Sequence, residues 1–140
     1  MLFDEAVYKT LAPIFGERNV YSSLTSDTLP KDKNDYVIPF ALFQSLGGDK
    51  YHSFERIYDI EKDNYHLELE IYAPRMSTAR QLSLKARMAL LKSPYFLAIH
   101  QYENMNDRTE WMNKIYGCRQ DFSVWVANDV RDYDFPQPKP

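Results

Sequence analysis

The fold is decided by one alternating stretch, Asn64-Tyr65-His66-Leu67-Glu68-Leu69-Glu70-Ile71-Tyr72-Ala73-Pro74. Side chains at successive positions of a β-strand project to opposite faces of a sheet. One face therefore carries Tyr65, Leu67, Leu69, Ile71 and Ala73. The other face carries His66, Glu68, Glu70 and Tyr72. The pattern predicts a strand over 64–73 that buries one face and that Pro74 ends.

The residues that follow predict a helix from Thr78 to about Lys92, stopped by Ser93-Pro94. Thr78 and Gln81 fit a capping box at its start. One apolar stripe of this helix consists of Ala79, Leu82, Ala86, Ala89 and Leu90. A second stripe, roughly opposite at about 100° per residue, consists of Leu84, Met88 and Leu91. Because a helix on a sheet needs one buried stripe, the second indicates either a partner surface or cover by the N-terminal helix.

The rest of the chain adds one helix and several strands. A helix is predicted over 4–15, with Pro13 ending or bending it and Gly16 at its end. A short strand is expected at 19–22 and longer strands at 36–46, 95–102 and 116–127, with polar loops at 25–35, 50–63 and 103–114. The sequence thus predicts an α+β fold of order α-β-β-β-α-β-β, with two helices on a mostly antiparallel sheet of about four strands. Residues 1–127 form the expected single domain, and 128–140 a flexible Pro-rich tail.

Composition narrows the class of protein. The chain has 140 residues, 44% of them hydrophobic and 15% aromatic, with one cysteine. These values exclude a membrane protein, a secreted disulfide scaffold and a multidomain enzyme. The formal net charge is −3, but the segment 74–92 holds five of the 17 basic residues and no acidic one. A basic helix in an otherwise acidic chain is either a solvated face or a surface that pairs with acidic groups of the same protein or of another copy.

The residues that could carry chemistry are few. His66, Glu68 and Glu70 alternate along the strand and form the one cluster that resembles metal ligands, but a single histidine without cysteine falls short of a zinc pattern. Cys118 with His100 would be the only nucleophile and base, yet Cys118 is expected to be a buried hydrophobe. We therefore predict no catalytic residue, no bound metal and no cofactor. The alternative is a small-ligand-binding or hydrolytic domain that uses the His66/Glu68/Glu70 face.

Contact residues are better candidates. On the predicted helix, the self-association surface consists of Leu84, Met88 and Leu91 with Arg80 and Arg87 at its rim. Trp125 and Asp121 form a second candidate interface, because an aromatic residue on the polar face of a strand is typical of an interface anchor. Asp49, Lys50 and Tyr51 are predicted to form a partner-contact loop that is less ordered than the sheet in the isolated chain.

Three stretches resemble the small tail-completion, or tail-terminator, proteins of long-tailed bacteriophages and prophages. The segment 3–15 is similar to their opening helix. Residues 65–74 and 79–91 resemble their central strand and their Ala/Arg/Leu-rich helix. Residues 116–126, Tyr-Gly-Cys-Arg-Gln-Asp-Phe-Ser-Val-Trp-Val, resemble their final strand with its Asp-aromatic pair and its Trp. The loops at 25–33 and 50–63 match no pattern of that family.

The resemblance implies a non-enzymatic minor tail protein. Several copies, usually six, would close into a ring that ends the tail tube and joins it to the head connector. The implied partners are other copies of the chain, the tail tube protein and the head–tail connector protein, with no membrane and no specific nucleic acid. The implied location is the virion tail, after assembly in the cytoplasm of the bacterial host.

Overall fold

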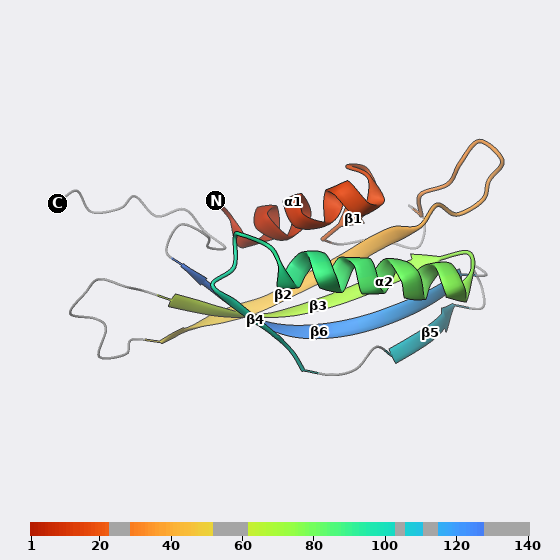
Figure 1. The fold of residues 1–140 in the computed structure, drawn as a ribbon. Coiled ribbons are helices and arrows are strands. Elements are labelled where there is room, and N and C mark those ends of the chain that lie inside the picture. The colour runs from red at the N-terminus through yellow and green to blue at the C-terminus, as the bar shows by residue number, and fades with distance from the viewer. Residues whose placement is uncertain (23–28, 52–61, 103–105, 111–114, 128–140) are drawn as a thin grey trace.

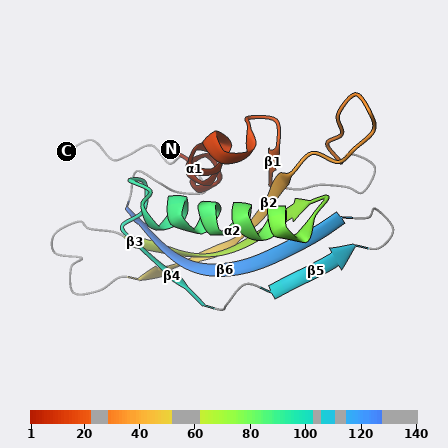
Figure 2. The ribbon, with the colours of Figure 1, turned by 45° about the vertical axis from the view of Figure 1, so that its right-hand side comes forward.

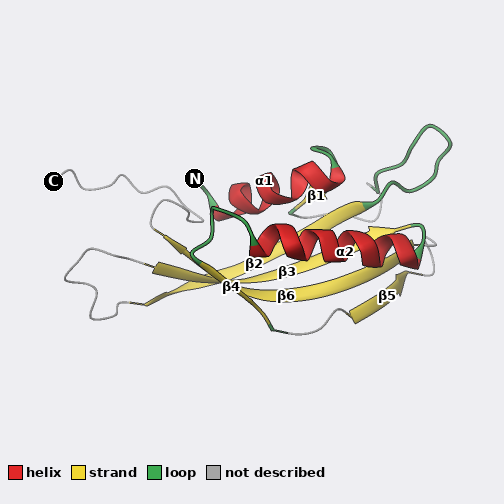
Figure 3. Cartoon of the chain, viewed as in Figure 1, coloured by secondary structure: helices red, strands yellow, loops and turns green. Residues whose placement is uncertain are grey.

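The computed structural model describes residues 1–22, 29–51, 62–102, 106–110 and 115–127, and for 47–51, 62–63 and 106–110 it describes the backbone alone. Within these described residues, two helices and six strands follow one another. Their bounds are α1 Phe3–Phe15, β1 Val20–Tyr21, β2 Phe40–Tyr51, β3 Lys62–Ala73, α2 Met76–Leu91, β4 Ala98–Gln101, β5 Asn106–Glu110 and β6 Ile115–Ala127. The order, α-β-β-β-α-β-β-β, confirms the predicted α+β class with its two helices and adds one strand (Figure 3).

The sheet has the order β1-β2-β3-β6-β4, and β5 pairs with β6 as well. Only β1 and β2 are parallel; the other pairs are antiparallel. The last strand is the organising one, because β3 pairs with one edge of β6 along 12 residues while β4 and β5 share its other edge. The alternating segment at 64–73 therefore lies at the centre of the sheet.

Both helices cover the same face of the sheet (Figures 1 and 2). The core lies between these two layers and includes the five apolar residues of β3 that the alternation predicts to be buried. It is completed by Phe3, Val7 and Leu11 of α1, Ala86 and Leu90 of α2, and Phe122, Val124 and Val126 of β6. Among the elements that the structure describes, none covers the opposite face. We call this the open face. Its side chains include Gln44 and Leu46 of β2, every second residue from His66 to Tyr72 of β3, and every second residue from Arg119 to Trp125 of β6.

Helix α1 ends as predicted but not at its proline. Gly16 adopts φ +95°, which an L side chain rarely adopts, and its N–H donates to the carbonyl of Ala12 at 2.8 Å. Pro13 lies inside the helix, which continues to Phe15. A proline there costs one hydrogen bond in the last turn, and the burial of Leu11 and Phe15 holds this turn on the core.

The predicted capping box is wrong. Helix α2 begins at Met76, so Thr78 is already in the first turn, and the N-terminal flanking residue Arg75 makes no side-chain cap. The main reason for the helix to form is tertiary packing, because Ala79, Ser83, Ala86 and Leu90 share one fully buried face.

Two predicted loops are partly strand. Asp49, Lys50 and Tyr51 belong to β2, in register with Asn64, Asp63 and Lys62 of β3, so they are not a loop. The register shifts between Leu46 and Asp49, and this irregularity accommodates the glycine pair at 47–48 within the strand. The segment 103–114, predicted to be a loop, contains β5. Most of the predicted loop 50–63 and the tail at 128–140 fall outside the described residues.

Among the helices described, neither is long and apolar enough to cross a lipid bilayer.

Candidate functional site

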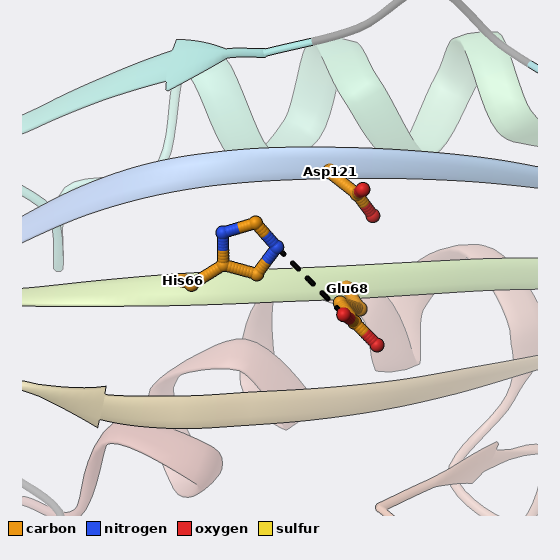
Figure 4. Close-up of side chains that lie close together, drawn as sticks. All are labelled: His66, Glu68 and Asp121. Carbon is orange, nitrogen blue, oxygen red and sulfur yellow. Dashed lines mark ion pairs between the residues drawn. The ribbon is translucent and has the colours of Figure 1, made fainter.

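Only some of the histidine and carboxylate side chains that resembled metal ligands lie close together in the structure. His66 and Glu68 project from β3 on the open face, and Asp121 joins them from β6, directly opposite Glu68 (Figure 4). One ligand atom from each of the three side chains lies within 4.8 Å of the others. Glu70 is not part of this group; its carboxylate accepts a hydrogen bond from Tyr72 Oη at 2.8 Å.

Arg119 supplies the positive charge of this cluster. Its Nη2 lies 3.0 Å from Glu68 Oε1, and its Nε donates to Asp121 Oδ1 at 3.1 Å. The hydrogen bond to Asp121 is the main reason that the pKa of Arg119 is raised above its ordinary value. The charges of Asp121, Glu68 and Glu70 raise this pKa further, and burial opposes them. A cation bound between Glu68 and Asp121 would have to displace the guanidinium, so the geometry describes an ion-pair network.

The sequence pattern that could have predicted this ion-pair cluster lies at two alternate positions of β6. Arg119 precedes Asp121 by two residues, so both lie on the face that the alternation of this strand assigns to polar residues. The alternation of β3 carries no information about its partner strand, and register alone brings Arg119 to the carboxylates.

Cys118 and His100 do not meet. Cys118 is buried on the helix-covered face, against Ala73 and Ala79. His100 is exposed and pairs in register with Ser123, on the open face. A nucleophile and its base must be within hydrogen-bond reach, so these two residues cannot act together.

The second apolar stripe of α2 is exposed to solvent. Leu84, Met88 and Leu91 have exposed fractions of 47%, 49% and 41%. Helix α1 packs beside α2 but does not cover these three side chains. Cover by the N-terminal helix therefore does not explain the second apolar stripe. We call this set the α2 stripe. Its neighbours Arg80, Lys85 and Lys92 are also exposed, while Arg87 is half-buried.

Trp125 and Asp121 lie on the open face, as the alternation of the last strand predicts. Both are half-buried, and Phe122, Val124 and Val126 are buried on the opposite side of the strand. At the same end of this face, the ring of His66 stacks on Tyr102 at a centroid distance of 5.2 Å, and Tyr102 itself is exposed. The two predicted interfaces thus lie on opposite sides of the molecule.

The fold is similar to that of a chain in a solved structure described as "Virion of native gene transfer agent (GTA) particle". The TM-score is 0.55 and the sequence identity 13%, and the match covers 89% of this chain and 93% of that chain. At this identity the similarity shows a shared fold. No family model matches the chain. No curated protein matches it either.

Proposed function

We propose that this protein is a structural subunit of a phage-like virion. The observation that carries the proposal is the fold, which matches a chain of a gene transfer agent virion over nearly the full length of both chains. The sequence resemblance to tail-terminator proteins, in 3–15, 65–91 and 116–126, points to the same class of particle. A fold alone does not define a function, but two independent likenesses to virion proteins favour one class.

Within that class, the resemblance favours a non-enzymatic ring that ends the tail tube and joins it to the head connector. The exposed α2 stripe supports this role, because a ring-forming subunit needs apolar surface that the isolated chain does not cover. Three such side chains make a small contact. The isolated chain is therefore expected to be a monomer when dilute and to associate when concentrated or seeded by a tail tube.

The proposed role can be tested by deleting the gene from the genome that encodes it and examining the particles by electron microscopy. Deletion should give heads without attached tails, together with tail tubes of irregular length. Complementation with the wild-type gene should restore complete particles, whereas complementation with Met88→Asp should not. Normal particles from the deletion strain would refute the proposal.

A further inference from the structure

The α2 stripe points away from the protein's own sheet and is bordered by positive charge. The buried residues Ala79, Ser83, Ala86 and Leu90 define the side of α2 that faces the core, and the stripe lies roughly opposite. The helix contains no acidic residue, and the exposed Lys85 and Lys92 border the stripe. Arg87 is half-buried, and its Nε is buried without a hydrogen-bond partner in the described part of the chain. Helix α2 therefore presents an apolar centre bordered by positively charged side chains.

The open face has the opposite charge. Three carboxylates, those of Glu68, Glu70 and Asp121, lie near one guanidinium, that of Arg119, which leaves a net charge of −2 on these four residues. Two exposed side chains with apolar surface, Leu46 and Tyr102, lie on the same face. The middle row of this face, which crosses β2, β3 and β6, consists of Gln44, Glu68 and Asp121.

The dimensions of the two surfaces agree. Helix α2 has 16 residues and is about 24 Å long. The open-face side chains of β6, from Arg119 to Trp125, extend over about 20 Å along the strand. The helix can therefore lie along the face and bring its cations over the carboxylates.

From these observations we infer that the α2 stripe of one copy docks on the open face of the next copy, so that copies associate head to tail. The occupant of each surface is a second copy of this chain, because the chain carries both an apolar surface with a basic border and an apolar surface with an acidic centre. The two surfaces lie on opposite sides of a two-layer molecule (Figure 2), so the contact joins unlike surfaces and repeats from copy to copy. The inference rests on the proposed function and adds the surface that receives α2.

Two variants, each blocking one surface, test the inference. The first is Met88→Asp, which places a charge in the α2 stripe. The second is Gln44→Lys with Leu46→Lys, which places two positive charges on the open face at exposed positions. Each variant alone should remain monomeric in sedimentation velocity at concentrations where the wild type associates.

An equimolar mixture of the two variants should form dimers and nothing larger. The Met88→Asp copy keeps an intact open face, and the other copy keeps an intact α2 stripe, so one functional contact remains between them. A contact between two α2 stripes would not be restored in this way. A mixture that stays monomeric would overturn the inference, as would normal association of the Gln44→Lys/Leu46→Lys variant.

Further variants and outcomes distinguish failure of the inference from misfolding, from an effect of net charge and from failure of the proposed function. Asn34→Asp, at an exposed position outside both surfaces, changes the net charge as Met88→Asp does and should leave association unchanged. If Met88→Asp lowers the melting temperature, Leu84→Asp provides the same block at a second exposed position. A wild-type chain that is still monomeric at about 1 mM would contradict self-association and with it the proposed function. If the wild type associates and Met88→Asp blocks it, but the open-face variant does not, only the inference fails.

Discussion

Gly117 lies beneath the ring of Tyr72, its partner across β3 and β6. A Cβ atom at position 117 would come within 2.5 Å of Tyr72 Cε1. The ring has little freedom to move, because it stacks on Phe40 at a centroid distance of 5.3 Å and its hydroxyl donates to Glu70. The glycine is thus required by the close approach of an aromatic ring, on the open face of the sheet.

We predict that Gly117→Ala lowers the free energy of unfolding by about 1–3 kcal/mol, the usual cost of overpacking a well-packed site. Urea unfolding followed by circular dichroism measures this. In a Tyr72→Ala background, where no ring covers position 117, the same substitution should cost much less. An equal cost in both backgrounds would show that the ring does not cause the strain.

Among the elements, a buried amide joins β6 to helix α2 and to strand β4. Gln120 is 1% exposed on the helix-covered face, where an apolar residue is the norm. Its Nε2 donates to the carbonyl of Ser83 in α2 at 2.9 Å, and its Oε1 accepts from Gln101 Nε2 of β4 at 3.0 Å. The side chain thus fixes how α2 and β4 sit against the last strand.

We predict that Gln120→Leu lowers the free energy of unfolding by about 1–3 kcal/mol, because the amide of Gln101 loses its acceptor and the carbonyl of Ser83 loses a donor. Gln101→Leu keeps the bond to Ser83 and should cost less. Because removing both partners of a hydrogen bond is less costly than orphaning one, the double variant should lose less than the sum of the two single losses. Thermal and urea unfolding of the four proteins test this, and strict additivity would contradict a direct bond between the two amides.

At the scale of the whole molecule, charge is separated between the two layers. The helix layer presents the cations of α2, and the open face presents a net negative cluster. Such a distribution steers copies toward a head-to-tail encounter more than it stabilises the complex, because exposed ion pairs contribute about 0–1 kcal/mol each.

We predict that Gln44→Glu, which adds a carboxylate to the middle row of the open face, strengthens self-association. The increase should be several-fold at low salt and should vanish in about 1 M NaCl, where the Debye length falls to about 3 Å. Sedimentation at the two salt concentrations gives the comparison, with Asn34→Glu as a control for net charge. A salt-independent effect, or an equal gain from the control, would contradict charge pairing between copies.

The direction in which most side chains face can be derived from the sequence. The strict alternation at 64–73 predicts the central strand and its buried residues, and the same period places Trp125 and Asp121 opposite Phe122 and Val124. The helical period also predicts a second apolar stripe on the second helix, although the structure is needed to show that this stripe is exposed. These properties are local, because the period of a strand or helix fixes the relative directions of its side chains whatever it packs against.

The tertiary structure alone decided which strands are neighbours and in what register. Only this pairing brings Arg119 and Asp121 beside Glu68 while leaving Glu70 with Tyr72, and it turns a possible metal-ligand pattern into an ion-pair network. Strand pairing also explains β5 and the end of β2. Their polar residues predict loops, but these segments form strands because a long neighbouring strand offers hydrogen bonds to their backbones. Pairing depends on contacts between residues far apart in the chain, and periodicity within one segment carries no information about them.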